Sequence, residues 1–132
     1  MTRTLTPKSY TCLPDSFAMM LHALPENVLR MLDYRGGPRN FHPQEMIDLC
    51  IQLGHRVTEI ELYPCFTGEK GLWDETKCKK RMDYYLRQYK GVLAGKVNGN
   101  NHAVYWNGTE IEDPNGTRYP LDRFEIRTFF FI

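Results

Sequence analysis

Apolar residues follow a helical spacing over most of the first ninety positions and a strand-like spacing in the last third of the chain. The helical pattern predicts helices over residues 12–24, 25–32, 43–53 and 74–89. Short runs bounded by turn residues predict strands over 56–62, 91–97, 102–106, 109–113 and 124–132. Helices followed by sequential strands favour an α+β fold, with N-terminal helices packed on a C-terminal antiparallel β-sheet.

The first predicted helix is apolar on nearly all sides, which is typical of a helix that other elements cover. Pro14 and Asp15 mark its start, because proline fits the first helical turn and a carboxylate suits the positive end of the helix dipole. Cys12 therefore stands at the N-terminus of a central core helix. Cys50 falls on the apolar side of the third predicted helix, where we expect an inert core thiol.

The composition and charge of the chain limit the classes of protein to which it can belong. The chain has 132 residues, 42% apolar and 25% charged, with a formal net charge of +1, so we expect one globular domain over residues 1–132. Its basic residues are interspersed with acidic ones, which argues against a nucleic-acid partner. No stretch approaches the roughly 18 apolar residues of a membrane span, and residues 1–6 lack the apolar core of a signal peptide. We therefore expect no membrane partner and a cytoplasmic protein.

The cysteines and histidines do not suggest a metal site or a cofactor. No two of the cysteines, at positions 12, 50, 65 and 78, have the Cys-x-x-Cys spacing of a zinc or redox centre, and we expect free thiols. His22 is expected in the core or at its rim, His42 as a helix cap and His55 in a loop. No glycine-rich phosphate loop is present, so we expect no cofactor and no metal.

Asn107-Gly108 is the strongest hairpin signal in the sequence, because both positions of a type I′ turn need positive φ. A two-residue turn here would set opposite each other Trp106 and Thr109, Val104 and Ile111, and His102 and Asp113. Directly opposed side chains have Cβ atoms roughly 4.5–5.5 Å apart, so Asp113 could orient the imidazole of His102. The face that carries this pair is apolar and is expected to face the core.

An ordinary cross-strand ion pair would explain His102 and Asp113 equally well if the two side chains were exposed. A catalytic pair is favoured by the apolar face and by Cys12 at the start of a helix that this sheet would cover. Helix N-terminal N–H groups and a nearby imidazolium both stabilise a thiolate, which is the nucleophilic form of cysteine. The sequence thus predicts a thiol-based site of Cys12, His102 and Asp113.

Three motifs, in this order, resemble the papain-like cysteine peptidases, and most closely the bacteriocin-processing (double-glycine leader) peptidases and their stand-alone relatives. They are Cys12 with FAMML, then DLCIQLGHRV, then HAVYWNGTEIEDPNG, and together they cover most of the chain. The resemblance implies a papain-like fold that cleaves a peptide or amide bond through an acyl-thioester. It further implies that Cys12 is the nucleophile, His102 the general base and acid, and Asp113 the residue that holds the imidazole.

One position departs from that family. Relatives usually carry a glutamine about six residues before the cysteine, whose amide helps to bind the oxyanion, and Thr6 stands there in this chain. Lys8, Ser9 or Asn101 could supply the missing donor. Asp15 is interpreted as a helix-start carboxylate, although its charge would oppose a thiolate. Two other functions stay open: a catalytically inactive module that binds a peptide or protein, and a deamidase or acyltransferase with the same triad.

Overall fold

The computed structural model describes residues 10–62 and 75–132. Within these ranges it contains four α-helices, one short 3-10 helix and six strands. The helices are α1 (Cys12–Leu21), α2 (Pro25–Met31), α3 (Pro43–Gln52), α4 (Glu75–Gln88) and the 3-10 helix η1 (Leu121–Arg123). The strands are β1 (Thr58–Glu61), β2 (Gly91–Val97), β3 (Asn100–Trp106), β4 (Ile111–Glu112), β5 (Arg118–Tyr119) and β6 (Glu125–Phe131).

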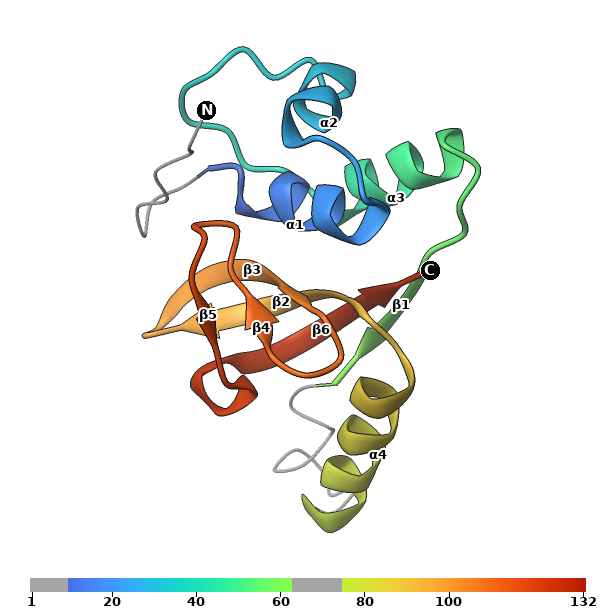
Figure 1. Ribbon diagram of the computed structural model, residues 1–132, viewed down its shortest axis with the longest axis vertical. Helices are drawn as coiled ribbons and strands as arrows, with labels where there is room; N and C mark the ends of the chain where they lie inside the picture. Colours follow the sequence, from blue (N-terminus) through green and yellow to red (C-terminus); the bar gives the residue numbers. More distant parts are fainter. Residues whose placement is uncertain (1–9, 63–74) are drawn as a thin grey trace.

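The six strands form one sheet in the order β1-β6-β2-β3-β4-β5, and every neighbouring pair is antiparallel. Helices α1, α2 and α3 lie on one side of this sheet, and α4 lies on the other (Figure 1). The predicted α+β class is therefore confirmed for the described residues. None of their helices has the length and apolar character that a membrane crossing requires.

The predicted elements occur with shifted ends, and β5 and η1 were not predicted. The first helix ends at Leu21 rather than at residue 24, because His22 adopts a left-handed conformation (φ 55°) and its N–H bonds back to the last turn. Such a residue closes the helix by satisfying its final carbonyl groups. The loop expected over residues 64–71, and Asp74 at the start of the fourth predicted helix, lie outside the described residues.

The predicted two-residue turn at Asn107-Gly108 is wrong. Trp106 pairs with Ile111 and Tyr105 with Glu112, so a longer loop joins β3 to β4. Gly108 has positive φ but Asn107 does not, and a type I′ turn needs both. The Asn107 side chain instead accepts hydrogen bonds from the N–H groups of Thr109 and Glu110, at 2.8 and 2.9 Å, which holds the longer loop.

A type I′-like turn does occur one hairpin earlier. Asn98 and Gly99 have φ values of 50° and 79° and connect Val97 of β2 to its partner Asn100 of β3. The observed β3–β4 pairing differs from the predicted one by two residues. Because side chains alternate with a period of two, residues of β3 and β4 that were predicted to share a face of the sheet still share one.

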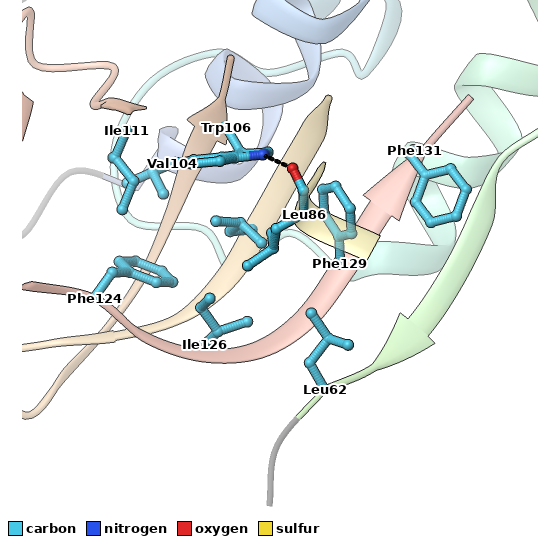
Figure 2. Close-up of a cluster of buried hydrophobic side chains, with 10 residues drawn as sticks. Leu62, Leu86, Val104, Trp106, Ile111, Phe124, Ile126, Phe129 and Phe131 are labelled. Carbon is cyan, nitrogen blue, oxygen red and sulfur yellow. Dashed lines mark hydrogen bonds between the residues drawn. The ribbon is translucent and has the colours of Figure 1, made fainter. Parts of the chain in front are cut away.

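Two apolar clusters occupy the two faces of the sheet. On the α4 side, Trp106 packs with Leu86 and with neighbouring strand residues, and its indole N–H donates to the Leu86 carbonyl at 2.8 Å (Figure 2). On the α1 side, Phe17 of α1 packs against Phe130 and Tyr105. The expectation that the central helix covers the face with Val104, Trp106 and Ile111 is therefore wrong: it covers the opposite face.

Candidate active site

Cys12 is the first residue of α1 and is half-buried. The first N–H groups of a helix have no acceptor within the helix, and they point toward its N-terminal end together with the positive end of the dipole. The preceding residue does not cap these groups, because the Thr11 hydroxyl donates to Asp15 at 2.9 Å instead. The sulfur of Cys12 therefore lies where a negative charge is favoured.

Asp15 is buried in the first turn of the same helix. Its carboxylate accepts the Thr11 hydroxyl, and its own N–H donates to the Thr11 carbonyl, also at 2.9 Å. These contacts agree with the interpretation of Asp15 as a helix-start carboxylate.

His102 is the third residue of β3 and lies opposite Gly95 of β2. On its other side, β4 pairs only with Tyr105 and Trp106, so no strand of the described residues covers the edge of β3 beside His102. The imidazole, which is 15% exposed, interacts there with two side chains. Its Nε2 lies 2.8 Å from Oδ2 of Asp113. The Cys12 side chain is also near enough to the ring to raise its pKa.

Asp113 begins a tight turn, Asp-Pro-Asn-Gly, that follows β4. Its carbonyl accepts from the Gly116 N–H at 2.9 Å, and its Oδ1 accepts from the Asn115 N–H at 3.0 Å. An aspartate at the first position of a turn commonly makes the latter bond, and proline suits the second position. The turn thus fixes Oδ1 and directs Oδ2 toward His102.

The Asp113 carboxylate has a third donor that sequence reasoning missed. The hydroxyl of Tyr119, on β5, donates to the same Oδ2 atom at 2.7 Å. Burial and this bond to Asp113 both raise the pKa of Tyr119 above its ordinary value, so the phenol stays protonated and remains a donor. No sequence pattern indicates this contact, because β5 is too short to show the alternation of a strand.

Opposing effects set the protonation of His102. Burial alone lowers the pKa of His102, but the hydrogen bonds with Asp113 and Cys12 and the charges of both partners raise it further, to about 9. Because Nε2 faces Asp113, Nδ1 is the ring atom left for the Cys12 sulfur. The imidazolium is therefore the form of His102 expected at neutral pH.

Cys12 and His102 both line a cleft of about 420 Å³. The rest of its lining comes from Tyr10 and Leu13, from the segment 39–43 before and at the start of α3, and from β2, β3 and β6. Asn101, one of the three candidates for the oxyanion donor, also lines the cleft. The other two candidates, Lys8 and Ser9, lie outside the described residues, as does Thr6.

Comparisons of the chain with protein-family models, with curated proteins and with solved structures find no match.

None of the other histidines in the described residues lines the cleft. His42 caps α3, as predicted: its Nδ1 accepts from the Gln44 N–H at 3.0 Å, and Glu45 completes the capping box. His22 is an exposed helix end, so it lies at the rim and not in the core, and His55 is exposed. In the described ranges, no three His, Cys, Asp or Glu side chains converge as metal ligands.

Cys50 is fully buried, and burial raises its pKa to about 11. This thiol is a core residue, as predicted, and a poor nucleophile at neutral pH. Cys78 is also buried, while Cys65 lies outside the described residues. Among the described cysteines, Cys12 alone lines the cleft.

Proposed function

We propose that this protein is a papain-like thiol hydrolase that cleaves a peptide or amide bond through an acyl-thioester on Cys12. The observation that carries the proposal is the position of His102, whose ring hydrogen-bonds with Asp113 and shares the wall of a cleft with Cys12. A nucleophile, a base and a group that orients the base are the three parts that covalent acyl transfer needs.

In the proposed reaction Cys12 starts as the thiolate, paired with the His102 imidazolium. Its sulfur attacks the substrate carbonyl carbon, and the C–N bond breaks after the tetrahedral intermediate forms. The His102 imidazolium gives its proton to the departing nitrogen, which leaves an acyl-thioester and a neutral ring. The ring then takes a proton from water as the hydroxide oxygen attacks the thioester. Release of the carboxylic acid restores Cys12 and the imidazolium. Asp113 keeps its hydrogen bond with Nε2 of His102 throughout the reaction, so Nδ1 stays directed at the sulfur.

Stabilising the oxyanion requires hydrogen-bond donors near the carbonyl oxygen. The Cys12 N–H is one candidate, because the first residue of a helix has no intrahelical acceptor for that group. The Asn101 side chain, exposed in the same cleft, is the second candidate. Loss of one such donor typically lowers the rate about a hundredfold or more, so Asn101→Ala should do so if this amide binds the oxyanion.

The test is the alkylation rate of each cysteine by iodoacetamide against pH, read by mass spectrometry, in the native protein and in His102→Ala. We expect Cys12 to react fastest below about pH 7 and to lose that advantage in His102→Ala, because the imidazolium stabilises the thiolate. Cys50 is the internal control, since its pKa of about 11 keeps it protonated. If Cys12 instead reacts only near pH 8.5, like an ordinary thiol, the hydrolase proposal fails and a peptide-binding module replaces it.

Product analysis separates the reactions that this triad could perform. A peptidase fragments its target, whereas a deamidase leaves the chain whole and heavier by about one mass unit per site. Incubation of a peptide mixture with the native protein and with Cys12→Ala distinguishes these outcomes in one mass-spectrometric comparison.

A further inference from the structure

The strand β6 carries a β-bulge beside the candidate site. Ala94 of β2 pairs with Thr128, but the next residue, Gly95, pairs with Ile126. Arg127 is therefore the extra residue of the bulge, between the β6 residues that pair with Gly95 and Ala94. A bulge interrupts the regular alternation of side chains and commonly redirects one of them near a functional site.

Arg127 lines the cleft that contains Cys12 and His102. On either side of it, Ile126 packs in the cluster that faces α4, and Thr128 lines the cleft. In a regular strand, Ile126 and Thr128 would point to the same face of the sheet. The extra residue lets Ile126 face α4 while Thr128 lines the cleft. The bulge thus explains how a strand with two buried faces also contributes Arg127 to the lining of the cleft that contains Cys12.

The charged residues that line the cleft are all basic. Arg39, Arg127 and the His102 ring are its basic lining groups, and none of the residues that line it in the described part of the chain is Asp or Glu. The Arg39 guanidinium has a structural role, because it donates to the Leu32 carbonyl and to the Glu45 carboxylate.

Arg127 pairs with an acidic neighbour in an exposed position. Its ion pair with Glu125 spans 4.0 Å, and the two side chains are 44% and 47% exposed. Exposed pairs of this kind contribute little and exchange readily for another carboxylate.

We propose that Arg127 is a substrate-binding residue that recognises a carboxylate close to the scissile bond, either an Asp or Glu side chain or the C-terminus of a peptide. This inference rests on the proposed hydrolase function and specifies its substrate class. A guanidinium pairs with a carboxylate through two parallel N–H···O bonds, which fixes position as well as charge.

The first test does not require turnover. Iodoacetate and iodoacetamide alkylate the same thiol, but only iodoacetate carries a carboxylate, so the ratio of their rates at Cys12 reports recognition of that group. Arg127→Gln should lower the ratio by about threefold or more, as expected for one unit charge lost within several ångströms. Arg127→Lys should retain most of it. Arg123→Gln removes the same charge at an exposed position outside the cleft and should leave the ratio unchanged.

Equal ratios in Arg127→Gln and Arg123→Gln would overturn the inference whether or not the protein cleaves peptides. This outcome is separate from failure of the proposed function, which shows instead as a Cys12 reactivity that does not depend on His102.

The second test identifies the source of the carboxylate. A proteome-derived peptide mixture is incubated with the native protein, Arg127→Gln and Cys12→Ala, and the cleaved positions are mapped by mass spectrometry. We expect native cleavage sites to carry Asp or Glu at one fixed position, or to lie at a fixed distance from the peptide C-terminus. Arg127→Gln should lose that preference. Native cleavage without either preference would overturn the inference while the hydrolase proposal stands.

Discussion

At the scale of single residues, the candidate site depends on how His102 is held. Its ring is nearly buried between a carboxylate and a thiol, and its raised pKa, about 9, results from these two neighbours outweighing the effect of burial. Asp113 is in turn held by Tyr119 and by its own turn. Each of these contacts can be tested by a separate substitution.

Asp113→Asn should lower the pKa of His102, because it removes the negative charge and the hydrogen bond that most strongly oppose the effect of burial. The measurement is an NMR titration of the His102 ring in the native protein and the variant. Asp122→Asn, which removes an exposed carboxylate elsewhere, is the matched control and should leave the titration unchanged. A His102 titration unaffected by Asp113→Asn would mean that Asp113 does not set the charge of the ring.

Tyr119→Phe should lower the free energy of unfolding by about 1.5–3 kcal/mol, the usual contribution of a hydrogen bond to a charged group. Tyr34→Phe is the matched control. Its hydroxyl donates at the same distance, 2.7 Å, but to an exposed carbonyl, that of Gly37, so its loss should cost less. Urea denaturation of both variants measures the difference. Equal losses would show that the Tyr119 contact is no stronger than an exposed one.

At the scale of elements, the sheet positions the site through a bulge and a close strand contact. Gly95 lies at the bulge, opposite His102. A Cβ atom built there would lie 1.9 Å from the Glu125 carbonyl oxygen, so β2 and β6 approach too closely for any side chain. The same bulge directs Arg127 into the cleft.

Gly95→Ala should therefore destabilise the protein by about 1–3 kcal/mol, the usual cost of overpacking, because the two strands must separate or shift register. Ala94→Ser adds one atom at the adjacent, half-buried position and should cost less. Urea denaturation compares the two variants. A free energy of unfolding unchanged by Gly95→Ala would contradict the close approach of β2 and β6.

At the scale of the whole molecule, stability should fall as the solution becomes alkaline. The folded pKa of His102, about 9, exceeds its ordinary value of 6.5, so its stabilising contribution is full below pH 6.5 and is lost as pH rises through 9. Cys50 extends the trend, because its pKa rises from 9.0 to about 11 on burial. The folded state thus favours the protonated form of both groups.

The free energy of unfolding, measured by urea denaturation between pH 6 and pH 10 in roughly half-unit steps, checks this expectation. It should decrease between pH 6.5 and 9 in the native protein. In His102→Gln, which has no proton to lose in this range, that part of the decrease should be absent. A native stability that is flat or rising from pH 6.5 to 9 would contradict the raised pKa of His102.

Local patterns in the sequence were sufficient to predict the helices and most strands. Cys12 begins a helix because Pro14 and Asp15 follow it, and Asp113 begins a turn because proline and Asn115-Gly116 follow it. These features depend on backbone preferences and side-chain periodicity within a few residues, and both can be read from the chain. The His102–Asp113 contact was predicted as well, although from the wrong pairing.

Only the tertiary structure decided the pairing, the faces and the remaining parts of the site. The hairpin register depends on the φ angle of Asn107, and the face that α1 covers depends on how two apolar surfaces are shared between α1 and α4. The contact of Tyr119 with Asp113 and the bulge at Arg127 join residues through strand pairing. Such pairing is set by packing across the whole sheet, so no local pattern of residues can specify it.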